Sequence, residues 1–306
     1  MTWFFLTIIG PFLYAITNHI DKILLSKYFK NGGVGTLILI SSLLSALALP
    51  FLFFANPSVF DTSIINITIL AIIGIIGVAV IWLYLTALDN EEASITVIFY
   101  QLIPVFAVIL GYFVLGEVLT KMQLVAMAII ILGTTIISFE IDADNHFTLR
   151  RQTIFYMLAA SGMEAVGSVA FKFVALEETV VTSLFWSFLA STIVGVFIFI
   201  FVRPYRENFI EAFQTNSKII ISLNFLNEIL FMLGDIVFAF AYLMAPIALV
   251  LLTNSFQPIF VVMVGIFLTI FFPKISVEKI AVKHMFQKLL AVAVTGIGTY
   301  ILLTSS

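Results

Sequence analysis

The chain has 306 residues, of which 62% are hydrophobic and only 10% are charged, and its formal net charge is −3. A water-soluble domain carries about 25% charged residues, so the composition excludes an ordinary soluble protein. The lack of a basic stripe argues against a nucleic-acid-binding protein. The chain has no cysteine, which excludes disulfides, thiolate metal sites and cysteine nucleophiles.

Long apolar runs recur along the whole chain and predict an all-α polytopic membrane protein. About 20 apolar residues cross the ~30 Å hydrocarbon core as a helix, and lipid favours helices because their backbone groups are satisfied internally. No basic segment precedes the first run and no small-residue cleavage site follows it, so we interpret it as a retained helix. The first half is predicted to contain five helices, at residues 3–20 (extending toward 25), 36–54, 65–88, 93–115 and 122–139.

A polar segment, 140–152, links this half to a second half with five further runs. The predicted helices of the second half are 153–174, 181–202, 219–244, 247–272 and 288–303. The segment between the last two, PKISVEKIAVKHMFQK, is basic and partly amphipathic. It either lies along the membrane surface or forms a plain loop.

The fourth helix of each half carries the same pattern, at residues 93–117 and 247–271. When Pro104 is set on Pro258, the identical pairs are Phe106 and Phe260, Val108 and Val262, Gly111 and Gly265, and Phe113 and Phe267. The sequence therefore predicts a duplication into repeats at 1–139 and 153–306. An odd number of helices per repeat inverts the second copy. Many secondary transporters are built from inverted repeats, with the substrate site between the halves near the midplane.

Lys and Arg residues gather in the loops after the first, fifth, seventh and ninth predicted helices. The positive-inside rule places these loops in the cytoplasm and both termini outside.

The spacing Pro104 to Gly111, followed by Gly116-Glu117 at the end of the helix, resembles the EamA-type members of the drug/metabolite transporter superfamily. The resemblance extends over nearly the whole chain. It implies ten helices in two EamA-like repeats and the transport of small metabolites. Relatives commonly have cytoplasmic termini, which conflicts with the charge count, and we follow the charges. The chain departs from the pattern at Phe271, which stands where the first copy has Glu117, and in the longer loop after the ninth helix.

Ionisable residues inside predicted helices are functional candidates, because a charge near the bilayer centre costs at least ~2.5–3.5 kcal/mol. Asn224, Glu228 and Asp235 are four and seven residues apart and share one helix face. We predict that Glu228, Asp235 and Glu164 carry protons during transport, since burial favours the neutral form of a carboxyl group. The alternative is that they pair with neighbouring helices for structural reasons.

The remaining polar candidates lie on the first, fourth, sixth, eighth and ninth predicted helices. Lys172 aligns with Lys22 in the other half, so we expect the two lysines to face each other. Alternatively, Asp21 and Lys22 lie at the end of the helix, and their side chains extend into the lipid headgroups. Polar residues beside Pro104 and Pro258 suit either a solute or interhelical packing. The predicted substrate-binding residues are Asn18, Lys22, Tyr100, Gln101, Lys172, Asn224, Asn254 and Gln257.

These observations predict a secondary transporter of a small organic solute, an amino acid or related metabolite, that works by alternating access with protons as the coupling ion. Mixed Glu, Asp and Lys residues in the site would suit a zwitterion. The alternative is an exporter of cationic drugs or other metabolites. An enzyme is not expected, because DDxxD-like and HExxH motifs are absent; a membrane-embedded enzyme, a channel or a scaffold are the rival classes. We expect no cofactor, no metal and no nucleic-acid partner, and we expect the bacterial plasma membrane as the location.

Overall fold

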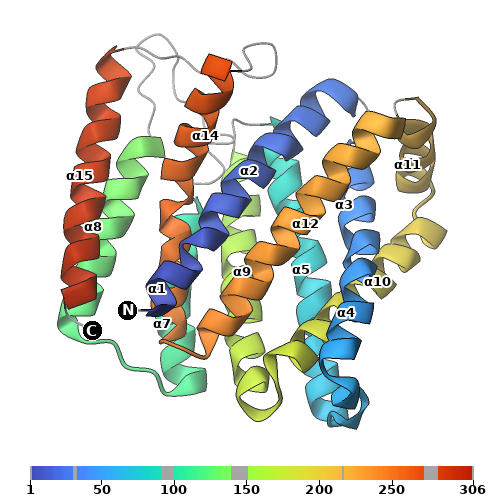
Figure 1. Ribbon diagram of the computed structural model, residues 1–306, viewed down its shortest axis with the longest axis horizontal. Helices are drawn as coiled ribbons and strands as arrows, with labels where there is room; N and C mark the ends of the chain where they lie inside the picture. Colours follow the sequence, from blue (N-terminus) through green and yellow to red (C-terminus); the bar gives the residue numbers. More distant parts are fainter. Residues whose placement is uncertain are drawn as a thin grey trace.

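The computed structural model describes residues 2–29, 33–90, 99–138, 151–215, 217–271 and 282–304, and these residues are helical almost throughout (Figure 1). Seven helices in the described part of the chain are long and apolar enough to cross a membrane. They are Thr2–Tyr28, Gly33–Ala55, Ile64–Asp89, Arg151–Glu177, Val180–Phe201, Lys218–Tyr242 and Ile247–Phe271. Shorter apolar helices occupy Tyr100–Leu115, Lys121–Thr135 and Val292–Thr304. The predicted all-helical class is therefore confirmed for the described residues.

The elements of the first half follow the predicted helices closely. They are α1 (Thr2–Thr7), α2 (Ile9–Ile23), α3 (Gly33–Leu44), α4 (Ala48–Ala55), α5 (Ile64–Asn90), α7 (Ile103–Leu110) and α8 (Lys121–Ser138). A π-helical turn, Leu24–Tyr28, prolongs α2, and a 3₁₀ turn, Ser45–Leu47, joins α3 to α4. The start of the predicted helix 93–115 and most of the predicted linker lie outside the described residues.

The second half contains one helix at a place where the sequence predicts a loop. Its elements are α9 (Arg151–Glu177), α10 (Val180–Phe201), α11 (Arg203–Thr215), α12 (Ser217–Tyr242), α13 (Ile247–Leu252), α14 (Gln257–Phe271) and α15 (Val282–Thr304). The unexpected helix is α11. It is amphipathic, because Phe209 and Phe213 pack on an apolar cluster while Arg203 and Glu207 pair in water with a 2.7 Å contact.

The last helix also begins earlier than predicted, at Val282 instead of residue 288. The end of the segment that we expected to be a loop or a surface helix is therefore part of α15. Its first nine residues, 273–281, lie outside the described residues.

Helices from the two halves pack against one another throughout the bundle. The α2 helix packs on α12 and α14, while α5 packs on α9 and α10. The α3 helix packs on α10, α7 on α13 and α9, and α8 on α15. The pair formed by α8 and α15 stands at one side of the molecule (Figure 1).

Each of the two matched prolines follows a 3₁₀ turn. Tyr100–Leu102 precedes Pro104 at the start of α7, and Thr253–Phe256 precedes Pro258 at the start of α14. A proline lacks the backbone donor that a continuous α-helix needs, so the preceding turn tightens. The two turns contact each other, and Gln101 Nε2 donates to the Ser255 carbonyl at 3.4 Å.

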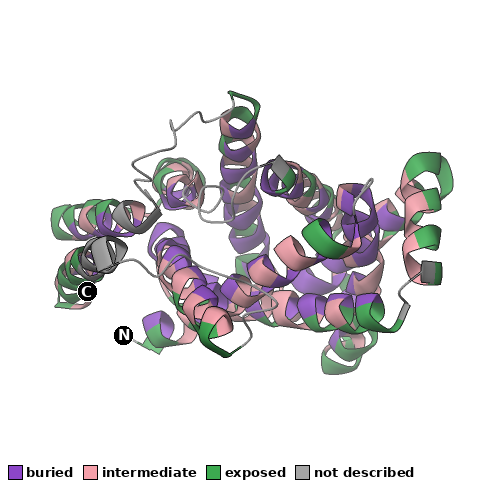
Figure 2. Cartoon of the chain, turned by 90° about the horizontal axis from the view of Figure 1, so that it is seen from above, coloured by how far each residue is buried: buried purple, intermediate pink, exposed green. Residues whose placement is uncertain are grey.

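The outer surface of the bundle is apolar. Phe51, Phe54 and Phe113 are 76%, 79% and 77% exposed. Figure 2 shows buried positions turned toward the interior of the bundle and exposed ones turned outward. A soluble protein rarely exposes large contiguous apolar patches, so this surface is suited to lipid.

Replacing Gly74 by alanine should lower the free energy of unfolding by about 1–3 kcal/mol. Gly74 is where α5 meets α10, and a methyl group there would lie 2.7 Å from Ala190 Cβ and still closer to the Ser187 carbonyl. Gly162→Ala is the control, because a methyl group there has no other atom within 4 Å. Thermal unfolding in detergent should show a lower Tm for the first variant only. Equal Tm values for the two variants would contradict the close packing of α5 against α10 at Gly74.

Candidate substrate site

A cavity of about 250 Å³ lies between the two halves of the bundle. Helices α2, α3, α5, α9, α10 and α12 contribute to its wall, together with residues beside the two prolines, Tyr100, Asn254 and Gln257. Each half therefore supplies side chains to one interior space.

Four acidic side chains line this cavity: Asp21 on α2, Glu164 on α9, and Glu228 and Asp235 on α12. Among the described lining residues there is no lysine, arginine or histidine. The cavity is therefore acidic and lacks an opposing cation in the described part of its wall.

Each carboxylate accepts one hydrogen bond from a neutral side chain. Tyr14 Oη donates to Asp235 Oδ1 at 2.6 Å, and Ser41 Oγ donates to Glu228 Oε2 at 2.5 Å. Asp21 Oδ1 accepts from Asn227 Nδ2 at 2.8 Å, and the contact from Ser168 to Glu164 is longer, at 3.4 Å. Among the described residues, the second oxygen of each acid has no hydrogen bond of this kind and could hold a proton or a solute.

The predicted neutral residues Asn18, Tyr100, Asn254 and Gln257 also line the cavity. Gln257 Nε2 donates to Asn18 Oδ1 at 2.7 Å, and Asn18 donates to the Tyr84 hydroxyl. The Tyr84 ring stacks on Tyr100, with centroids 5.8 Å apart. These contacts link α2, α5, the turn before α7 and α14 around one end of the cavity.

Two other predicted residues lie near the cavity without lining it. Asn224 lines a neighbouring hollow of about 40 Å³, and its amide donates to the Ile220 carbonyl at 2.7 Å. Gln101 is buried between helices, where it accepts from Thr134 Oγ1 at 3.0 Å. For Gln101 the geometry fits the packing alternative.

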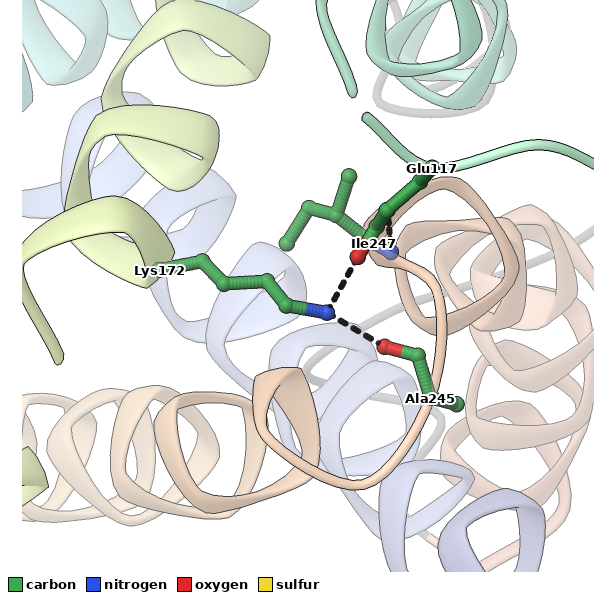
Figure 3. A network of polar contacts seen from close by, with 4 residues as sticks. All are labelled: Glu117, Lys172, Ala245 and Ile247. Carbon is green, nitrogen blue, oxygen red and sulfur yellow. Dashed lines mark hydrogen bonds and ion pairs between the residues drawn. The ribbon is translucent and has the colours of Figure 1, made fainter. Parts of the chain in front are cut away.

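The predicted lysines do not line the cavity, and the expectation that they face each other is wrong. Lys22 Nζ donates to the Leu88 carbonyl at 2.9 Å. Lys172 Nζ instead pairs with Glu117 Oε1 at 2.5 Å and donates to the Ala245 carbonyl at 2.7 Å (Figure 3). The two aligned lysines therefore have separate partners, and Phe271 stands in the second half of the chain where the first half has Glu117.

The structure explains why glycine and glutamate stand at positions 116 and 117. Gly116 has a φ of +67°, and it is the only described residue whose φ is positive. Only glycine adopts this conformation without strain, and it ends the helix. The turn directs Glu117 toward the second half, where its Oε2 accepts from the backbone N–H of Ile247 at 2.7 Å. The motif therefore ties the end of the first repeat's fourth helix to α9 and to the start of α13.

Asp21 and Tyr14 were not among the predicted site residues. The lipid headgroups were an alternative place for Asp21, yet it lines the cavity. The signal was present in the sequence, since Tyr14, Thr17, Asn18 and Asp21 follow the i, i+3, i+4, i+7 spacing of one helix face. Ser41 had no such signal, because its role depends on the position of Glu228 across the cavity.

Residues 1–139 match the EamA-like transporter family. The matched segment is the first half of the chain, which is therefore similar to this family. This match and the long apolar helices together indicate an integral membrane protein. No curated protein matches the sequence.

A solved crystal structure has the same fold as this chain. It superposes with a TM-score of 0.62 at 15% identity, over 97% of this chain and 95% of the other. It is one of 28 chains of solved structures that match. At this identity the likeness shows the fold alone.

Proposed function

We propose that this EamA-like protein is a secondary transporter that moves a small organic solute through the cavity by alternating access, in exchange for protons. The observation that carries the proposal is the set of four carboxylates on one cavity without an opposing cation among the described lining residues. Buried ionisable groups in a membrane bundle are costly and mark ion or substrate pathways.

We further propose that the bundle is a pair of inverted five-helix repeats. The packing supports this, because exchanging the halves turns the contact of α2 with α12 into the contact of α9 with α5. The same exchange turns the contact of α2 with α14 into that of α9 with α7. The 3₁₀ turns before Pro104 and Pro258 contact each other, as expected near an axis that relates the halves.

The cavity favours a cationic solute. The expectation of an amino acid depended on lysines in the site, and Lys22 and Lys172 both have partners elsewhere. Without a cationic side chain in the described wall, a substrate carboxylate would meet four acids and no counter-charge. A protonated amine would meet complementary charge, which favours the alternative stated in the sequence analysis, a cationic compound.

Exchange with protons follows from the same carboxylates. A carboxylate that holds an ammonium group is unprotonated, and a protonated one has lost the attraction for a cation. Asp21, Glu164, Glu228 and Asp235 are the acids concerned, and Tyr14, Tyr84, Tyr100 and Tyr242 are the other titratable groups on the described wall. Cation and proton would therefore occupy the site in turn, which is the requirement for an exchanger.

We propose the bacterial plasma membrane as its location, with the basic loops in the cytoplasm. Lys27 follows α2, and Arg203 and Arg206 are on α11. The C-terminal end of α2 and the α11 helix lie toward the same end of the bundle, at the top of Figure 1. Clustering of basic groups at one end supports this orientation.

The test is solute flux in proteoliposomes. Reconstituted protein should accumulate a radiolabelled organic cation in vesicles with an acidic interior, and the rate should saturate with concentration. Collapse of the pH gradient with a protonophore should stop net accumulation and leave solute exchange intact. Flux that rises linearly with concentration would indicate a pore, and no flux for any solute would reject the transporter.

A further inference from the structure

We infer that the cavity binds an elongated aliphatic cation with two amino groups, a diamine or polyamine. This rests on the proposed function, since it names the class of solute for the same site.

The four acids of the cavity are spread along α12 and the helices α2 and α9. Glu228 and Asp235 are seven residues apart on α12, a rise of about 10.5 Å along the helix. Glu228 is beside Asn227, whose amide holds Asp21, and both acids line the adjoining hollow. Asp235 interacts electrostatically with Glu164 on α9, and Glu228 interacts with both Asp235 and Asp21. Negative charge is therefore divided between two places about two helical turns apart.

This division fits an extended ligand better than a compact one. Among the described residues no three acidic or histidine side chains come together as metal ligands. A metal ion or a single ammonium group would satisfy one pair of acids and leave the other. A chain with an amino group at each end would satisfy both.

Three neutral polar groups on the cavity wall lack a hydrogen-bond partner. Ser42 Oγ, Ser187 Oγ and Asn254 Oδ1 are buried without one, and each of these residues is at most 8% exposed. Asn254 Oδ1 can only accept a hydrogen bond, so it calls for an N–H or O–H donor. Buried polar groups in folded proteins are normally satisfied. Their placement on this wall is independent of the acids. The Asn254 oxygen fits a ligand that donates hydrogen bonds, and the two serine hydroxyls can accept from the same ligand.

The rest of the wall suits a hydrocarbon chain between two charges. Ile73, Ile76 and Val80 of α5 and Phe188 of α10 offer apolar surface to methylene groups. The stacked rings of Tyr84 and Tyr100 offer a face to an ammonium group. A volume of 250 Å³ corresponds to about eight water molecules, room for a short diamine or a small polyamine.

The experiment is isothermal titration of the full-length protein, in a neutral detergent, with five probes: cadaverine, spermidine, n-pentylamine, lysine and 1,5-pentanediol. Cadaverine or spermidine should bind about tenfold or more tightly than pentylamine, because the second amino group reaches the second pair of acids. Pentanediol should not bind measurably. Lysine should bind more weakly than cadaverine, from which it differs by one carboxylate.

Two variants test the two-ended arrangement. Glu228→Gln and Asp235→Asn should each reduce cadaverine affinity by about tenfold or more, toward the affinity for pentylamine. Glu207→Gln, in the exposed pair on α11, should leave cadaverine affinity unchanged. Size-exclusion profile and unliganded Tm establish that each variant is folded. If a variant does not fold, the comparison of the five probes on the unaltered protein still tests the inference.

Equal affinity for cadaverine and pentylamine, or tighter binding of lysine or pentanediol, would overturn the inference. If the protein exchanges another solute with protons but does not bind diamines, the inference fails and the proposed function stands. If diamines bind but no flux occurs in proteoliposomes, the diamine-binding site is supported and the proposed transport function is rejected.

Discussion

Replacing Lys172 by methionine should lower the free energy of unfolding by up to about 3 kcal/mol, because it leaves the half-buried Glu117 without its cation. The side chains of Lys172 and Glu117 are only 7% and 18% exposed, and their contact of 2.5 Å joins the two halves of the chain. Glu117 also holds the backbone N–H of Ile247 at 2.7 Å, and Lys172 holds the Ala245 carbonyl. Losing the lysine therefore disturbs a network of three segments.

The measurement is chemical unfolding in mixed micelles. The double variant Glu117→Gln with Lys172→Met should recover much of the loss, since it removes both charges together. Arg203→Ala is the matched control, because its pair with Glu207 is 77% and 57% exposed. Breaking an exposed pair costs about 1 kcal/mol or less. A loss for Lys172→Met no larger than for Arg203→Ala would contradict a structural role for the buried pair.

Replacing Glu228 by glutamine should abolish most of the effect of a pH gradient on transport. The amide keeps the shape of the side chain and can still contact Ser41, but it cannot exchange a proton. At saturating labelled cadaverine, or the solute identified by flux, an inside-acid gradient should accelerate uptake by the unaltered protein. The ratio of rates with and without the gradient should fall by about tenfold or more in the variant.

A direct count of protons complements the flux. Solute binding to detergent-solubilised protein in weak buffer should release protons, and Glu228→Gln should release fewer. Glu207→Gln, far from the cavity on α11, should behave as the unaltered protein in both assays. An unchanged gradient effect together with unchanged proton release would dismiss Glu228 as a coupling residue, and the same assays then apply to Asp235 and Glu164.

The sequence alone determined the membrane class and most helix positions, because apolar runs of membrane length and the matched Pro104 and Pro258 leave few other structures. It also pointed to Glu164, Glu228 and Asp235, which line the cavity, because carboxylates within apolar helices are rare enough to stand out. It missed α11, whose amphipathic pattern is short, and it began the last helix six residues late.

Only the tertiary structure decided which polar side chains meet. Asp21 and Lys22 are neighbours in sequence, yet one lines the cavity and the other bonds to the Leu88 carbonyl. Lys172 was expected at the site but pairs with Glu117, 55 residues away in the sequence. Helical periodicity fixes the face of a helix on which a residue lies. The partner that the face meets depends on how distant helices pack, and this packing separates the acids of the cavity from the lysines.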